Sequence, residues 1–177
     1  QANSAERCEF WLTKMIDANR ISIERGEKNF IPKPDVTTYN LCMDAHFQLG
    51  DASRVQDLLI EMDSTNGLIT PNTESFSKVI RAWLNDELNM PQYGLPGSSL
   101  MHAWNWLNEL LNREKHGEAA MLGPTPELFS AILKTAARTV STFVAVRLLS
   151  HEFRSYGSLQ SYHTCQNARG ENLLMIG

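Results

Sequence analysis

The sequence has few of the features that usually signal catalysis or a bound metal. It contains only three cysteines in 177 residues, Cys8, Cys42 and Cys165, which are too few and too scattered for a disulfide framework or a metal site. It has no glycine-rich phosphate loop and no His-Glu-x-x-His motif, and its five histidines are dispersed. We therefore expect no enzyme activity, no metal site and no cofactor.

The sequence also lacks a long apolar run and a positive net charge, and both absences limit the kinds of partner that we expect. No apolar run approaches the roughly 18 residues that a membrane span needs, so we expect no membrane partner. The net charge is −4, which gives no support to nucleic-acid binding by bulk charge. The chain begins at Gln1 rather than Met, so we expect a fragment or a processed product, with any targeting segment upstream.

The sequence does contain a repeated pair of short helices. Its clearest copy spans residues 36–72, where apolar side chains recur three and four positions apart on both sides of Gly50. This spacing predicts helices over 36–48 and 52–63, because glycine tolerates the left-handed conformation that ends a helix. Pro71 closes the unit.

The same pattern returns along the chain. Tyr39 and Phe76, the aromatic anchors of two copies, lie 37 residues apart, and Phe129 follows after 53 more, with two loops accounting for the extra length. A period in the thirties made of helix pairs indicates a stacked array. We predict an all-α fold, a right-handed α-solenoid of antiparallel helix pairs. Its single domain, 1–177, has five parts: a partial repeat 1–35, a repeat 36–72, a repeat with loop insertions 73–125, a repeat 126–158 and a degenerate partial repeat 159–177.

These motifs resemble those of the pentatricopeptide repeat family. The family pattern has an early aromatic and a small polar residue in the first helix, a glycine between the helices, a late methionine and a final Pro-Asp or Pro-Asn. The matching residues here are Tyr39-Asn40, Gly50, Met62 and Pro71-Asn72. The match is good over 36–72, looser over 73–125 and partial over 126–158. The resemblance implies a fragment with three to four repeats.

The resemblance also implies single-stranded RNA binding. In the family, one base is read by the polar residue after the early aromatic together with the last residue of the repeat, because first helices line one face at a regular step. On this sequence the pairs are Asn40 with Asn72, Ser77 with Thr125, and Ser130 with about Ser158, while Asp35 ends a repeat whose first helix is missing. The paired amides imply a preference for pyrimidines, with both side chains accessible in the groove.

The same resemblance places the chain in a mitochondrial or plastid protein that processes or stabilises RNA. Other proteins are possible further partners, and no small-molecule substrate is expected.

The candidate residues also have a simpler explanation. Asn, Ser and Thr near helix starts are common as helix caps, which would account for Asn72 and Thr125. Ser77 and Ser130 could simply be exposed to solvent. For Asn40, the cleaner surrounding motif favours contact with a base.

Two observations favour a rival function, a protein-interaction scaffold of the tetratricopeptide type without RNA binding. The family usually has an aliphatic residue two places before the aromatic, and this chain has Thr37, Glu74 and Glu127 there. The charges of the three first helices, 36–48, 73–86 and 125–138, also sum to zero. Since neutralisation of the backbone supplies much of nucleic-acid affinity, these repeats alone should bind RNA feebly.

The four tryptophans could be platforms on which bases stack. Trp11, Trp83 and Trp104 lie on apolar stripes, which favours packing in the core. Trp106 lies off its stripe and could be exposed.

Overall fold

The structure is a computed structural model. It describes residues 2–26, 33–65, 68–89, 97–118, 122–139, 162–166 and 172–176. Two compact units divide the chain, Gln1–Val140 and Ser141–Gly177, where the sequence suggested one domain of residues 1–177. Each unit is described by itself.

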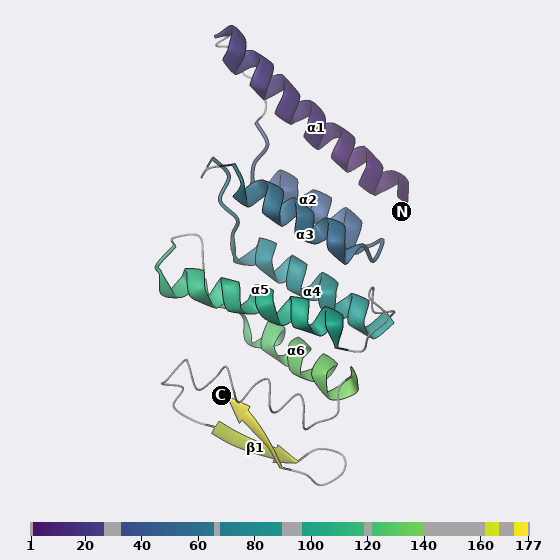
Figure 1. Cartoon of the computed structure of the whole chain (residues 1–177), viewed down its shortest axis with the longest axis vertical. Coiled ribbons are helices and arrows are strands. Elements are labelled where there is room, and N and C mark those ends of the chain that lie inside the picture. Colours follow the sequence, from purple (N-terminus) through teal and green to yellow (C-terminus); the bar gives the residue numbers. More distant parts are fainter. Residues whose placement is uncertain are drawn as a thin grey trace. The chain divides into compact units, whose positions relative to one another are not determined.

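The described part of the first unit is helical. Its helices are α1 (Ala2–Arg25), α2 (Val36–Phe47), α3 (Ala52–Asp63), α4 (Thr73–Asn89), α5 (Ser98–Lys115) and α6 (Pro126–Thr139). Figure 1 shows α2 with α3 and α4 with α5 as successive pairs. Beyond these pairs, α2 contacts α4, and α4 contacts α6. The predicted all-α fold built from stacked helix pairs is therefore confirmed in this unit.

The helix pair α2–α3 forms for the reasons that the sequence suggests. Asp35 caps α2, and its carboxylate accepts a hydrogen bond from the Thr38 backbone N–H at 2.8 Å. Gly50 takes the left-handed conformation between the helices, with φ of 77°. Asp51 then caps α3 by accepting from the Arg54 backbone N–H at 2.9 Å. The result is a tight turn that reverses the chain.

The core lies along the apolar stripes of the stacked helices. The stripes expected for α3 and α4 are buried, with these members: Val55, Leu58, Leu59, Met62, Phe76, Val79, Ile80, Trp83 and Leu84. For α6 the apolar spacing predicts a buried stripe of Phe129, Ile132, Leu133 and Ala136. The buried face lies slightly differently, because Leu128 is buried and Phe129 only half-buried.

The start of α5 is capped from outside its own sequence. Gly97 precedes the helix and has no side chain to cap it. The buried carboxylate of Glu87, near the end of α4, accepts from the backbone N–H groups of Ser99 at 3.0 Å and Leu100 at 3.1 Å. A carboxylate at a helix N-terminus satisfies donors that would otherwise lack partners. Glu87 thus fixes the end of α4 against the start of α5.

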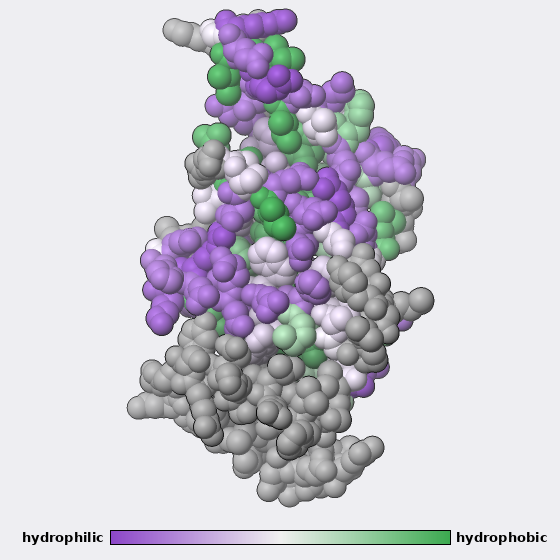
Figure 2. All heavy atoms as spheres, viewed as in Figure 1, coloured by the Kyte–Doolittle hydropathy of each residue, from purple (hydrophilic) through white to green (hydrophobic). Residues whose placement is uncertain are grey.

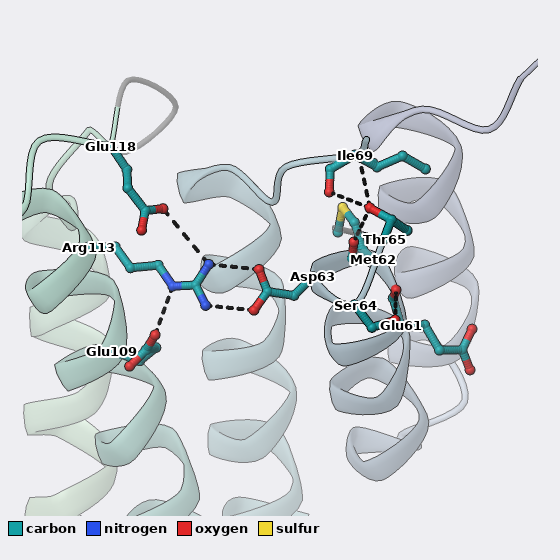
Figure 3. Close-up of polar contacts among 9 residues, drawn as sticks. All are labelled: Glu61, Met62, Asp63, Ser64, Thr65, Ile69, Glu109, Arg113 and Glu118. Carbon is teal, nitrogen blue, oxygen red and sulfur yellow. Dashed lines mark hydrogen bonds and ion pairs between the residues drawn. The ribbon is translucent and has the colours of Figure 1, made fainter. Parts of the chain in front are cut away.

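One arginine joins three helices. Figure 3 shows the Arg113 guanidinium of α5 between Glu109, Glu118 and Asp63, the last residue of α3. Its two terminal nitrogens donate to the two Asp63 carboxylate oxygens at 2.7 and 2.9 Å, and its Cζ lies 5.2 Å from the ring centroid of Phe76 in α4. The hydrogen bonds from Arg113 lower the pKa of the Asp63 carboxyl. This contact ties one helix pair to the next.

The burial of the tryptophans differs in part from the prediction. Trp83 and Trp104 are buried, as expected. The prediction that Trp11 lies in the core is wrong, since 61% of it is exposed. Among the described helices α1 packs mainly against α2, through the side that carries Ala5 and Leu12, and its Glu9 also pairs with Arg54 of α3. The stripe of α1 is therefore wider than the surface that covers it. Trp106 is half-buried, and its indole N–H donates to Gln56 Oε1 at 2.8 Å.

The second unit contains strands where the sequence suggested another helix. Tyr162–Gln166 forms β1 and Asn172–Ile176 forms β2, paired antiparallel with Tyr162 opposite Ile176. Aromatic and β-branched residues favour a strand, and a segment this short carries too weak a helical period to outweigh them. The sequence of residues 158–170 suggested the start of another first helix, and the strand over Tyr162–Gln166 shows that this prediction is wrong. The helix expected to begin at Ser141 lies outside the described residues.

None of the described helices combines the length and the apolar character that a bilayer span requires.

Replacing Leu107 by Ala should lower the free energy of unfolding by about 2–5 kcal/mol, because Leu107 is fully buried and the change leaves a cavity. The same change at Leu68, which is 87% exposed, should alter it by less than about 0.5 kcal/mol. Urea unfolding of both variants measures the difference. Equal effects at the two sites would show that the assignment of the core is wrong.

Replacing Asp63 by Asn should destabilise the protein at pH 7 by up to about 1 kcal/mol, the range for a solvent-accessible ion pair. The folded pKa of Asp63 is depressed below its usual 3.8, so its contribution is present above that value and is lost as the pH falls through the folded pKa. The gap between wild type and variant should therefore close toward pH 3. The control is Asp57→Asn, an exposed change on α3, whose effect should be smaller at pH 7. A gap for Asp63→Asn that stays constant with pH would contradict this account.

Candidate nucleic-acid interface

The start of α2 determines which way each of its side chains faces, Asn40 among them. The capping contacts of Asp35 start the helix, and Tyr39 is then buried in the core. Asn40 follows directly and turns toward the next helix pair. Hydrogen bonds from the Thr38 backbone and side chain lower the pKa of Asp35. Asp35, predicted as an RNA-binding residue, thus acts as a helix cap in this structure.

A hydrogen-bonded group joins Asn40 and Asn72, as the sequence predicted that they would meet. The hydroxyl of Ser75, in the first turn of α4, lies 2.8 Å from Asn40 Oδ1 and 3.0 Å from Asn72 Oδ1. Asn72 Oδ1 also accepts from the Ser75 backbone N–H at 2.9 Å, so Asn72 caps α4. Asn40 is only 5% exposed and Asn72 is half-buried. The expectation that both are freely accessible is wrong for Asn40.

Both amides line an open pocket of about 130 Å³ at the junction of α2 and α4. Its apolar wall is formed by Val36 and Leu41, and Leu41 is 59% exposed. The amide oxygens are engaged by Ser75, while no hydrogen bond from either Nδ2 group is found among the described residues. The pocket therefore offers hydrogen-bond donors beside an apolar surface.

The rim of the pocket is acidic. Asp44 of α2 and Glu74 of α4 both line it. The ammonium of Lys78 contacts Asp44 closely and lies 3.3 Å from Glu74. One cation thus offsets two carboxylates, and its charge is largely used within the protein. The pocket gains little attraction for phosphate from this group.

Each residue of the second predicted pair forms a hydrogen bond near its own position in the chain. The Ser77 hydroxyl donates to the Thr73 carbonyl of its own helix at 2.8 Å. Thr125 stands at the start of α6, where its hydroxyl oxygen accepts from the Leu128 backbone N–H at 3.4 Å. Within the described part of the chain, no hydrogen bond joins Ser77 to Thr125. For Thr125 the structure shows the role of a helix cap.

The third predicted pair is incomplete. Ser130 is half-buried on α6. Ser158 lies outside the described residues. Glu127 lies at the start of the same helix. Hydrogen bonds from its own backbone and from the Thr125 side chain lower the pKa of the Glu127 carboxyl.

Sequence reasoning missed two residues of the site. Ser75 could have been found, because it stands three residues after Asn72, the spacing of a reciprocal helix cap. Leu41 gave no signal, since an apolar residue next to Asn40 could as well be buried. Its exposure becomes clear only when the neighbours of α2 are placed.

Among the residues that the structure describes, no three His, Cys, Asp or Glu side chains gather in a way that could hold an ion.

Comparisons with known proteins give a remote likeness. No protein-family model matches the chain, and no curated protein matches it. Among solved structures, it is similar to the crystal structure of a pentatricopeptide repeat protein from maize, with a TM-score of 0.34 and 16% identity. The match covers 86% of this chain and 24% of that one, so the chain spans about a quarter of its length. Membership in that family stays a prediction from the motifs.

Replacing Ser75 by Ala should remove the hydroxyl between Asn40 and Asn72 and leave the buried Asn40 oxygen without this partner. An unsatisfied buried acceptor costs about 1–3 kcal/mol, so the free energy of unfolding should fall by that amount. The matched control is Ser77→Ala on the same helix, where the lost hydrogen bond is local and the expected change is under about 0.5 kcal/mol. If urea unfolding gives equal losses for the two variants, the hydroxyl does not join the helix pairs.

Proposed function

We propose that this chain binds single-stranded RNA, with one base held in the pocket between α2 and α4. The observation that carries the proposal is the meeting of the Asn40 and Asn72 amides in one open pocket at the junction of two helix pairs. Unstacked bases are recognised by hydrogen bonds to their edges together with contacts to their faces. The pocket supplies both kinds of contact.

The hydrogen bonds within the site determine which groups face the ligand. Because Asn40 Oδ1 accepts from the Ser75 hydroxyl and Asn72 Oδ1 accepts from the Ser75 backbone N–H, the Nδ2 groups of Asn40 and Asn72 are the available donors. They suit acceptor atoms on a base edge, such as the exocyclic carbonyl oxygens of pyrimidines. Val36 and Leu41 can pack against the face of the base. This replaces the aliphatic contact that Thr37 cannot supply.

The affinity of this pocket for RNA should be low. Lys78 is occupied by Asp44 and Glu74, and the chain carries a net charge of −4. Backbone neutralisation supplies a large share of nucleic-acid affinity and weakens with added salt. Binding is therefore best sought at low ionic strength, and further repeats in a longer chain would add to it.

A second candidate is a protein-interaction scaffold. The acidic rim formed by Asp44 and Glu74 favours it, because two carboxylates beside an apolar wall would attract a basic peptide. In either case we propose binding rather than catalysis. A mitochondrial or plastid location stays a prediction from the family resemblance.

Replacing Asn40 by Asp tests the proposal with little change in shape. The aspartate keeps an oxygen for Ser75 but replaces the donor in the pocket by an acceptor. We expect the wild-type chain to prefer oligopyrimidine over oligopurine RNA modestly. The variant should bind pyrimidine RNA at least about fivefold more weakly, the effect of one hydrogen bond of about 1 kcal/mol, and its preference should be flat. Fluorescence anisotropy at low salt measures both quantities.

The control is Asn105→Asp, which adds the same charge at an exposed position of α5. It should weaken the binding of all RNAs slightly and alike. Unfolding in urea checks that both variants remain folded. Equal effects of the two substitutions, or tighter binding of a lysine-rich peptide than of RNA, would favour the scaffold instead.

A further inference from the structure

The rim of the pocket between α2 and α4 holds a carboxylate that the proposed function leaves without a role. Asp44 stands four residues after Asn40, and Asn40 four residues after Val36, so the three side chains follow one another on one side of α2. One turn of the helix advances the chain by about 5.4 Å. All three residues line the same pocket. An apolar side chain, an amide and a carboxylate are therefore arranged within reach of a single base.

The hydrogen bonds of Ser75 determine which end of the Asn40 amide faces the pocket. The Ser75 hydroxyl oxygen accepts from the Asn72 backbone N–H at 3.4 Å, so its own hydrogen is available to Asn40 Oδ1 at 2.8 Å. Asn72 Oδ1 accepts from the Ser75 backbone N–H at 2.9 Å. Asn40 is only 5% exposed, so its remaining accessible group is limited to the pocket. The two Nδ2 groups are left as donors for a ligand.

A lysine holds Asp44 at the rim. The Lys78 ammonium contacts Asp44 Oδ1 and lies 3.3 Å from Glu74 Oε1. Only 17% of the Lys78 side chain is exposed, whereas 50% of the Asp44 side chain is. Among the described residues, no hydrogen bond or ion pair involves the second carboxylate oxygen, Asp44 Oδ2. Lys78 thus orients the carboxylate and leaves one of its oxygens as an acceptor.

The pocket therefore presents two donors and an acceptor, and the bases differ in how they match this set. Cytosine carries two acceptors, O2 and N3, followed by an amino group, and a carboxylate is a suitable acceptor for that amine. Uracil would place its N3–H against an amide donor and its O4 against the carboxylate. Adenine and guanine each have one acceptor on this edge, so one amide would lack a partner, which is costly in a buried site. Cytosine alone satisfies all three groups.

We propose that this pocket selects cytosine over uracil, with Asp44 as the specificity-determining residue that accepts a hydrogen bond from the exocyclic amino group. The inference rests on the proposed function, because it requires a base in this pocket, and it goes further by choosing between the two pyrimidines. A hydrogen bond to an ionised acceptor is stronger than one between neutral groups. Lys78 is a positioning residue, since it acts through Asp44.

The surroundings favour one base over a docking helix as the occupant. A partner helix needs a continuous apolar groove. Val36 and Leu41 are the apolar members of the lining, and the pocket has a volume of about 130 Å³. On the face of the molecule that Figure 2 shows, hydrophobic side chains of the described residues lie among hydrophilic ones. The apolar wall is sufficient for the face of a single base.

The first test replaces Asp44 by Asn, which can donate to uracil O4 as well as accept from the cytosine amine. Fluorescence anisotropy at low salt and pH 7 compares oligocytidylate with oligouridylate. The wild-type chain should bind oligocytidylate about fivefold more tightly or better, and Asp44→Asn should bind the two alike. The substitution also releases the charge of Lys78, which raises the affinity for both RNAs, so the ratio is the quantity to compare. The matched control is Asp57→Asn, the same change at an exposed position of α3, which should keep the ratio.

The second test uses the unaltered protein and changes the ligand. In an oligonucleotide of 2-pyrimidinone, each base keeps O2 and N3 but lacks the amino group. The wild-type chain should bind it about fivefold more weakly than oligocytidylate, the effect of one lost hydrogen bond. Urea unfolding checks that the Asp44→Asn and Asp57→Asn variants are folded, and the ligand series gives the answer if the first of them is not.

The outcomes separate this inference from the proposed function. Binding that is weakened by Asn40→Asp but is equal for oligocytidylate, oligouridylate and the 2-pyrimidinone ligand would overturn the role of Asp44 and leave the pocket. A ratio that changes equally in Asp44→Asn and Asp57→Asn would assign it to net charge, with the same consequence. Tightest binding of an RNA of alternating guanosine and uridine would show that the carboxylates read guanine instead. No binding of any RNA at low salt would overturn both proposals.

Discussion

Each helix of the first unit can bury its apolar stripe only against the helices next to it, and this constraint governs the rest of the unit. The row formed by α2, α4 and α6 exists because each of these helices covers part of its neighbour. Stability is then a sum of contacts between neighbours, so Leu107 and Trp83 matter through the surfaces they join. A helix covered on one side only, such as α1, must expose the remainder of its stripe. The exposed Trp11 is a consequence of position in the array.

Apolar stripes determine that helices stack, but polar contacts determine how they are placed. Arg113 reaches from α5 to Asp63 at the end of α3, and Gln56 of α3 accepts from the indole N–H groups of Trp83 at 3.1 Å and Trp106 at 2.8 Å. Each contact has a geometry that a shift along the helix would break. The position of Asn40 relative to Asn72 depends on this placement. Residues far from the pocket therefore help to shape it.

The sequence predicted those features that depend on local rules. Helical spacing and turn residues predicted the bounds of α3 correctly, and those of the first helices of the repeats within a few residues. Gly50 and Asp51 also marked the turn before α3 correctly. The repeat pattern also paired Asn40 with Asn72, and both residues line one pocket. It missed the burial of Asn40 and the exposure of Trp11, because both depend on which neighbour covers a helix. It missed Ser75 because this residue has two partners in the repeat before, the helix cap Asn72 and the buried amide of Asn40.

That double role links recognition to packing. Ser75 of the repeat 73–125 holds both amide oxygens of the repeat 36–72, that of Asn40 through its hydroxyl and that of Asn72 through its backbone N–H, and this directs their Nδ2 groups toward the pocket. The pocket therefore exists only while α2 and α4 are packed, and a ligand that bridges both amides would stabilise that packing in return. A polar junction of this kind costs little when every oxygen has a partner. In such an array, the junctions that hold the helix pairs together are also the places where one ligand can contact two repeats at once.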